Sequence, residues 1–493
     1  MAEAALALAI ALPLLASVLS LPLGRRAPHL LWPVVPGALA IAAVIAERVR
    51  NDGEVLHLLG GWPAPLGIVL RADGLAAAFL GLGAVVASGT GLFAVRYFAA
   101  DEGSRRSFSF WPLFFGIWAA ANGTFVGRDT FNLYVALELL TICAVAMVAL
   151  EGRTANVAAG MRYLLYALLA SLSYLIGVAL LYGAYGTLDM AQLAAKVRPT
   201  PASHAAAAMV SVGLFAKTAL FPFHAWLPPA HGGAPAPASA LLSAIVVKAS
   251  FYVLLRLWFD VMPPLATPQV TMLFGLLGTM AVLAGSLLAL RQEELKQVVA
   301  YSTVAQTGYL FLVFPLAGAA NEVQPWAASA WTGAVFQGLS HGLAKAAMFL
   351  AAGALILSAG SGRIDALAGL GRAAPVASFA FGLSAVSLMG LPPSGGFLAK
   401  YLMLTASLAG GRWWWGLVLV AGGLLTAAYF FRPLSRLMME RDEAAPAARR
   451  VHWSLEWIPL VLALCAVGLG LASIEPFRLA QVGSPVAAET GLQ

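Results

Sequence analysis

The fold of this chain is decided by residues 216–256, which read AKTALFPFHAWLPPAHGGAPAPASALLSAIVVKASFYVLLR. Apolar runs dominate this stretch, yet Lys217 and Lys248 lie within them and Pro222 interrupts the first run. A proline inside a membrane-spanning helix removes a backbone hydrogen bond, and the freed groups must be satisfied by protein or water. The stretch therefore predicts two membrane-spanning helices, each carrying a buried charge, of which the first is broken.

The rest of the chain has the same character. Of its 493 residues, 61% are hydrophobic and 10% are charged, whereas a soluble protein carries about a quarter charged residues. Apolar runs of about 20 residues, each long enough to cross a bilayer, recur throughout. We predict an all-α integral membrane protein with about fourteen transmembrane helices, whose approximate spans are 4–23, 29–46, 73–97, 109–126, 130–150, 158–184, 205–225, 234–257, 269–289, 297–318, 328–358, 373–404, 411–438 and 453–472.

A second helix break is predicted at Pro392 and Pro393, shortly before Lys400. Broken helices at matching places in two halves are typical of inverted-repeat transporters with a working site near the midplane. We therefore expect two inverted five-helix repeats, helices 4–8 and 9–13, with helices 7 and 12 broken. The predicted division is residues 1–108 (helices 1–3), 109–257 (first repeat), 258–438 (second repeat) and 439–493 (last helix and tail).

The net charge of +7 indicates orientation rather than nucleic-acid binding, because the arginines are scattered through short connections without a basic stripe. One set of alternate connections, which includes Arg25, Arg26, Arg105 and Arg106, is the more basic. By the positive-inside rule this set is cytoplasmic and both termini are outside, in a bacterial inner membrane. The first apolar segment has no basic residue ahead of it, so we expect a retained helix rather than a signal peptide.

Several other classes of protein are excluded. Cys143 and Cys465 provide neither a disulfide framework nor a zinc site, and no His/Cys/Glu grouping has the spacing of metal ligands. Glycine-containing runs lie within apolar helices rather than after strands, which argues against Rossmann and P-loop folds. We expect no cofactor and no metal.

Four lysines lie well within apolar spans: Lys217, Lys248, Lys345 and Lys400. A charge at the bilayer centre costs about 2.5–3.5 kcal/mol on insertion scales. A buried lysine can titrate near neutral pH, which an exposed one cannot. Snorkelling to the interface or structural pairing would explain one such lysine, but four together favour a proton pathway.

Glu138 is the matching acid, and we predict that it pairs with Lys217 because the pair removes two uncompensated charges at once. The alternative is a fixed ion pair that only locks two helices. His341 precedes Lys345 by four residues, so the two share a helix face, and histidine titrates in the range that a relay requires. His224 is expected on the face of Lys217, two turns on. For His341 or His224 taken alone, a satisfied core histidine is an equally good interpretation. We place His224 and His231 in a second tier of candidates.

These residues resemble a known family, the antiporter-like subunits shared by respiratory complex I, membrane-bound hydrogenases and Mrp-type sodium/proton antiporters. The resemblance rests on the stretch from Ala216 to Arg256, and on ELKQVVAYSTVAQTGYL (294–310), LSHGLAKAAMFLAAG (339–353) and GLPPSGGFLAKYLML (390–404). Chain length, Lys400 and the His341–Lys345 pair look most similar to the D-type subunit of Mrp antiporters.

The resemblance implies a proton relay. Glu138 matches the family's fifth-helix glutamate, Lys217 its seventh-helix lysine and Lys248 its central eighth-helix position. His341 and Lys345 match the eleventh helix, and Lys400 matches the twelfth-helix residue from which the path leads to the opposite side. Some members have glutamate at that last position, and the lysine argues against the complex I subunit that carries it.

Three functions remain open at this stage. The first is a proton-translocating subunit of a multi-subunit cation/proton antiporter, which exchanges protons and possibly Na⁺ and works with other membrane subunits. The second is a proton-pumping membrane subunit of a complex I-like dehydrogenase or a membrane-bound hydrogenase, driven by redox partners. The third is a scaffold or receptor bundle with structural ion pairs, which four intramembrane lysines disfavour.

Overall fold

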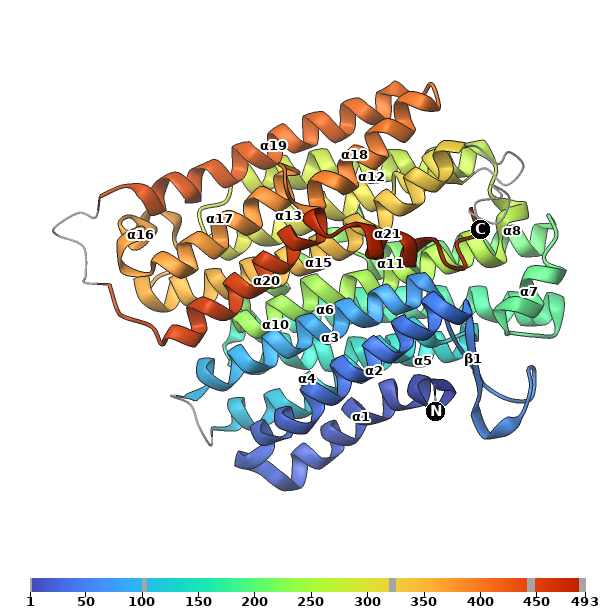
Figure 1. Cartoon of the computed structure of the whole chain (residues 1–493), viewed down its shortest axis with the longest axis horizontal. Helices are drawn as coiled ribbons and strands as arrows, with labels where there is room; N and C mark the ends of the chain where they lie inside the picture. The colour runs from blue at the N-terminus through green and yellow to red at the C-terminus, as the bar shows by residue number, and fades with distance from the viewer. Residues whose placement is uncertain (1, 100–103, 319–324, 441–447, 487–493) are drawn as a thin grey trace.

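A computed structural model describes residues 2–99, 104–318, 325–440 and 448–486 of the chain. The described part is a bundle of long helices with one two-stranded hairpin (Figure 1). The start of helix α1 (Ala2–Leu23), the hairpin and short helix α7 (Met190–Lys196) lie at one end of the bundle, and short helix α16 (Leu370–Ala373) lies at the other. The predicted helical membrane fold is confirmed.

The first part of the chain supplies the hairpin and the first helices of the bundle. Its elements are the 3-10 helix η1 (Gly24–Leu30), α2 (Leu31–Asp52), β1 (Val55–Leu58), β2 (Val69–Ala72), α3 (Gly74–Tyr97), α4 (Arg105–Val126), α5 (Thr130–Val148) and α6 (Thr154–Tyr185). The middle part contains the first interrupted helix. Its elements are α8 (Pro201–Lys217), the 3-10 helix η5 (Phe223–Trp226), α9 (Leu227–Gly233), α10 (Ala236–Leu241), the π-helix η6 (Leu242–Val246), α11 (Val247–Arg256) and the π-helix η7 (Leu257–Val261).

The last part contains the second interrupted helix. Its elements are α12 (Pro268–Leu290), α13 (Leu295–Leu310), α14 (Val313–Ala317), α15 (Pro325–Ala359), α17 (Pro375–Met389), α18 (Gly395–Ala409), α19 (Trp413–Met438), α20 (Trp453–Leu471) and α21 (Ile474–Gln481). The gap between α8 and η5 contains Pro222, and the gap between α17 and α18 contains Pro392 and Pro393. Both predicted helix breaks are therefore confirmed.

Ten helical stretches among the described residues are long and apolar enough to cross a membrane. This criterion counts residues 4–52, where two spans were predicted, as one stretch, and it leaves out α4, the short α8 and the interrupted α17–α18 pair. The count of fourteen spans and the inverted repeat therefore stay predictions.

The connection between the second and third predicted spans folds into a small hairpin that the sequence did not predict. Strands β1 and β2 pair antiparallel, with Val55 opposite Ala72 and Leu58 opposite Val69. Asp73 follows directly and caps α3, since its side chain accepts a hydrogen bond from the Ala76 amide at 3.0 Å. The hairpin thus fixes the point at which α3 begins.

Close helix packing depends on glycine, as is typical where lipid offers no hydrophobic drive for helix association. A Cβ at Gly278 of α12 would lie 2.6 Å from the Gly308 carbonyl oxygen of α13, and a Cβ at Gly308 would lie 2.3 Å from the Gly278 carbonyl oxygen. The two backbones are therefore too close for any larger residue at this crossing.

We expect Gly278→Ala to destabilise the protein by about 1–3 kcal/mol, because the added methyl group forces α12 and α13 apart. The measurement is the melting temperature of the purified protein in detergent. Gly81→Ala is the matched control, since a Cβ there meets nothing within 4 Å. Equal melting temperatures for the two variants would contradict the packing argument.

Candidate functional site

Glu138 and Lys217 form the predicted ion pair. Lys217 is the last residue of α8, and its Nζ lies 3.0 Å from Oε1 of Glu138 on α5. The same Nζ donates to Oγ1 of Thr141 at 3.1 Å, and Ser171 of α6 donates to Glu138. The lysine side chain is 4% exposed and the glutamate side chain 18%. The pair therefore joins three helices at a point nearly closed to solvent.

The chain breaks directly after Lys217. Ala219 has φ +55°, a left-handed conformation that a helix cannot continue through. The last carbonyls of α8 find other donors: Thr218 Oγ1 donates to Leu214 at 2.6 Å, and Trp226 Nε1 donates to Ala216 at 2.9 Å. Lys217 is thus held at the C-terminal end of a half-helix, where the helix dipole favours positive charge.

The expectation that His224 shares the helix face of Lys217 is wrong. The α8 helix ends at Lys217, and His224 lies beyond the break in η5. Its ring is half-buried and stacks on Phe221, with ring centroids 5.2 Å apart. The helix break after Lys217 therefore separates His224 from the helix face on which Lys217 lies.

Lys400 lies at the second break in a related way. Its Nζ donates to the carbonyl oxygens of Leu388 and Met389, both at 3.0 Å, at the C-terminal end of half-helix α17. The ammonium also lies 4.6 Å from the ring centroid of Tyr309, a cation–π contact. Gly390 ends α17 with φ +81°, and a Cβ there would lie 2.6 Å from Cδ of Lys400. Glycine at this turn therefore leaves the space that the lysine occupies.

Lys248 and Lys345 are completely buried. Lys248 follows the π-helix η6 and donates to the carbonyl of Ser243 within it. Lys345 on α15 donates to the Val299 carbonyl at 2.7 Å and to the hydroxyl of Ser302. A carbonyl thus holds Lys248, a carbonyl and a hydroxyl hold Lys345, and within the described residues neither lysine forms an ion pair.

His341 lies one helical turn before Lys345. It shares α15 with Lys345, and the charges of Lys248, Lys345 and Lys400 all act on its ring. The ring is buried, and neither ring nitrogen forms a hydrogen bond with any residue that the structure describes. The second-tier residue His231 on α9 is similar: it is buried, stacks on Phe349 at 4.6 Å, and feels the charges of Lys248, Lys296 and Lys345.

One polar face of α13 connects the central lysines. Ser302 accepts from Lys345, and Thr303 forms a 2.9 Å hydrogen bond with Ser243, whose carbonyl accepts from Lys248. Gln306 donates to the Leu388 carbonyl at 3.0 Å, the acceptor that Lys400 also uses.

The sequence reasoning assigned no role to these three α13 residues. The signal was present, because residues 302, 303 and 306 are polar and fall on one face of the helix. Across the described part of the chain, no hydrogen bond or ion pair joins the Glu138–Lys217 pair to this group.

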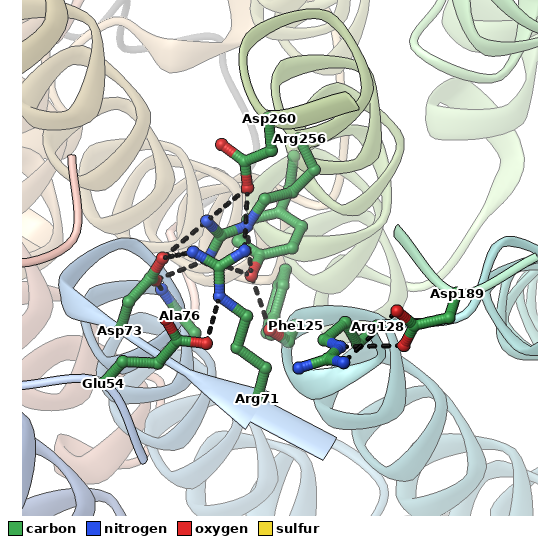
Figure 2. Close-up of polar contacts among 10 residues, drawn as sticks. Glu54, Arg71, Asp73, Ala76, Phe125, Arg128, Asp189, Arg256 and Asp260 are labelled. Atoms are coloured by element: carbon green, nitrogen blue, oxygen red, sulfur yellow. Dashed lines mark hydrogen bonds and ion pairs between the residues drawn. The ribbon is translucent and has the colours of Figure 1, made fainter. Parts of the chain in front are cut away.

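A second charged cluster, also missed, lies at the bundle end that carries the hairpin (Figure 2). Arg256 at the end of α11 bonds Asp73 and lies 3.1 Å from Oδ2 of Asp260. Arg71 of β2 lies 3.1 Å from each of the two aspartates and 3.0 Å from Glu54. An arginine within the apolar run YVLLRLWF is the signal that could have found this cluster, because a buried charge requires a partner.

The cluster continues toward the centre of the bundle along α11. Arg256 donates to Oη of Tyr252 at 2.9 Å, and Tyr252 donates to the Phe125 carbonyl at 2.5 Å at the end of α4. Nearby, Arg128 and Asp189 form a 2.8 Å pair (Figure 2). These contacts fix one end of α11, the helix that carries Lys248. In the described part of the chain, no three His, Cys, Asp or Glu side chains converge as metal ligands would.

We expect Arg256→Leu to destabilise the protein by about 3–5 kcal/mol, because it leaves two buried aspartates without their main counter-charge. The measurement is the yield of monodisperse protein in detergent together with its melting temperature. The control is Arg48→Leu, whose partner Asp52 is 55% exposed in a surface pair, so no measurable change is expected. A stable Arg256→Leu variant would show that the cluster does not anchor α11.

The family model described as the transmembrane segment of NADH:quinone oxidoreductase and Mrp antiporters matches residues 127–426. The chain belongs to this family. All six primary relay candidates, from Glu138 to Lys400, fall inside the matched region.

Curated relatives from two kinds of complex are similar in sequence. The N-type subunit of the NADH-quinone oxidoreductase of Desulforudis audaxviator is 34% identical over 90% of this chain and 90% of its own length. The D-type subunit of the Na(+)/H(+) antiporter of Alkalihalophilus pseudofirmus is 31% identical over 76% of this chain and 74% of its own length.

Solved structures agree. A chain of the Mrp complex from Dietzia sp. superposes with a TM-score of 0.89 at 27% identity, covering 98% of this chain and 97% of that one. A chain of an archaeal membrane-bound sulfane sulfur reductase superposes with a TM-score of 0.87, also at 27% identity, covering 98% of each. The predicted family resemblance is confirmed.

Proposed function

We propose that this chain is the proton-translocating membrane subunit of a multi-subunit monovalent cation/proton antiporter. The observation that carries the proposal is the Glu138–Lys217 ion pair at the interrupted end of α8. Both ionisable groups lie inside the bundle, and Lys217 is the last residue of α8 before the helix is interrupted. The antiporter subunits among the relatives and the Mrp structure support the same reading.

The first step of the proposed mechanism is electrostatic. While the pair is closed, Glu138 stabilises the protonated form of Lys217. When the pair opens, Lys217 loses its counter-charge and releases its proton more readily. The proton then moves toward Lys248. Among the described residues, no hydrogen bond or ion pair connects the Glu138–Lys217 pair to Lys248, so the proton must cross this interval without a direct polar contact. We propose that this interval is the controlled step.

Beyond Lys248, the proposed path follows the polar face of α13. The Ser243–Thr303 contact leads from Lys248, and Ser302 leads to Lys345. The His341 ring lies among the three lysines and can accept or donate a proton there. Lys400 ends the path. Because carbonyl dipoles rather than carboxylates hold these ammonium groups, proton loss does not leave an unpaired anion behind.

The arrangement in the membrane is part of the proposal. Residues 109–257 and 258–438 form the two inverted halves, flanked by residues 1–108 and 439–493. Both termini face the outside of a bacterial inner membrane, as supported by the basic connections that include Arg25 and Arg105. Other membrane subunits of the complex are its partners.

A second candidate is a proton-pumping membrane subunit of a redox complex. It is favoured by the 34% identity to a NADH-quinone oxidoreductase subunit over 90% of both chains. The relay is the same in both cases, and only the energy source differs. Purifying the complex from its host distinguishes the two, because a redox complex contains iron and acid-labile sulfide and an antiporter complex does not.

We expect Lys217→Ala and Glu138→Ala each to reduce transport to the level of vesicles lacking the protein, while the chain remains in the membrane in normal amount. The measurement is proton movement in inverted vesicles, with the amount of chain checked by immunoblot. Lys196→Ala is the control, because this lysine is exposed and bonds only the Tyr185 carbonyl. If the pair only locks two helices, the variants lose assembly instead of transport.

Lys400 gives a test of protonation against fixed charge. We expect Lys400→Arg to fail nearly as completely as Lys400→Ala, because arginine keeps its proton at every accessible pH. Lys400→Glu should retain part of the activity, because a buried glutamate can titrate. The three variants are compared in the same vesicle assay. Full activity of the arginine variant would mean that Lys400 supplies only charge and that the path ends elsewhere.

A further inference from the structure

A hollow of about 810 Å³ opens on the flank of the bundle, at the end opposite the hairpin. Its walls come from η1, the start of α2, the end of α3, and the starts of α4 and α20. It lies outside the proposed relay and shares no residue with it.

Three arginines line this hollow: Arg25 of η1, Arg96 at the end of α3 and Arg105 at the start of α4. All three are exposed, and none forms an ion pair with any residue in the described part. The described lining residues include no aspartate or glutamate, residues 100–103 being outside the described part. The hollow therefore has a concentrated positive charge without a counter-charge in its described lining.

Below the arginines the walls are apolar and aromatic. Trp32 is 73% exposed and Trp453 is 66% exposed, and Leu92 and Phe108 are exposed as well. Tryptophan side chains of this kind lie at the level of lipid headgroups, where an apolar ring meets water. The hollow is thus cationic near the arginines and apolar along the rest of its wall. A phospholipid complements this arrangement, because its headgroup carries the phosphate and its acyl chains are apolar.

The second large hollow of the bundle flank differs in charge. It has a volume of about 490 Å³ and lies near the other end, between α2, α3 and α20. Its one arginine, Arg50, lies 2.8 Å from Glu47 and 3.6 Å from Glu475. Of these two hollows, only the first contains arginines that form no ion pair with a described residue.

We propose that the hollow at η1, α3, α4 and α20 binds one anionic phospholipid. The phosphate lies among Arg25, Arg96 and Arg105, and the acyl chains run along Leu92 and Val95 of α3. Basic pockets between transmembrane helices bind acidic headgroups in this way. A helix of a neighbouring subunit is the less favoured occupant, because it would have to bury three arginines that a headgroup satisfies at the membrane surface.

The test is lipid binding to the purified full-length protein by native mass spectrometry, with phosphatidylglycerol and phosphatidylcholine titrated separately. We expect one phosphatidylglycerol to bind preferentially. Replacing the three arginines by Arg25→Gln, Arg96→Gln and Arg105→Gln should weaken it by about fivefold per arginine, roughly a hundredfold together. Phosphatidylcholine binding should not change.

The matched control carries Arg153→Gln, Arg291→Gln and Arg372→Gln, which remove the same charge from exposed positions at the same end of the bundle. Equal weakening in both triple variants would overturn the site, because it would reflect general attraction to acidic lipid. Displacement of the lipid by millimolar glycerol phosphate would also overturn it, since a free phosphate would then be the ligand.

Two further measurements keep the proposal testable if the triple variant is unstable. Arg96→Lys keeps the charge and the fold, and should retain the preference for phosphatidylglycerol. In the assembled complex, Trp32→Cys should react with a lipid-borne crosslinker. Efficient crosslinking of that cysteine to a neighbouring subunit instead would show that protein fills the hollow and would overturn the proposal.

Discussion

An ammonium group inside a bilayer must find its hydrogen-bond acceptors within the protein, and interrupted helices supply them for two of the four buried lysines. Lys400 uses the two carbonyls at the end of α17, and Lys248 uses a carbonyl of the π-helix η6. Lys217 is itself the last residue of a half-helix. Helix interruptions thus supply the acceptors of Lys400 and Lys248. Glu138 and Thr141 of α5 hold Lys217, and the uninterrupted helix α13 holds Lys345.

The four lysines are not held equally. Among them, and within the described residues, only Lys217 has a carboxylate partner, whereas neutral dipoles hold the other three. An ion pair stabilises one protonation state strongly, and a set of carbonyl and hydroxyl dipoles does so less. The polar face of α13 links the dipole-held group into one network, and the ion pair lies apart from it. This asymmetry is the physical reason for proposing that Lys217 controls proton transfer and that the other three lysines conduct the proton onward.

Helix α11 connects this interior to a rigid anchor. Lys248 lies near its start, and Arg256 ends it within a largely buried cluster of paired charges at the hairpin end of the bundle. Buried ion pairs contribute little net stability, but removing one partner is costly, which fixes the geometry. One end of this helix is therefore held by counter-charges. About two turns away, the helix carries an ammonium group whose hydrogen bond in the described structure goes to a backbone carbonyl.

The sequence by itself determined the helical membrane class, both helix breaks and the Glu138–Lys217 partnership. Apolar length, proline and uncompensated charge are local properties with a strong energetic meaning in lipid. Only the tertiary structure decided that Ser302, Thr303 and Gln306 connect the lysines, that Arg256 meets Asp73, and that His224 lies off the face of Lys217. Those contacts join residues far apart in the chain, or depend on how a broken helix changes direction. Acceptors that are backbone carbonyls cannot be predicted from the sequence either. Every residue has a carbonyl, and only the fold shows which carbonyls are free to accept a hydrogen bond from a lysine.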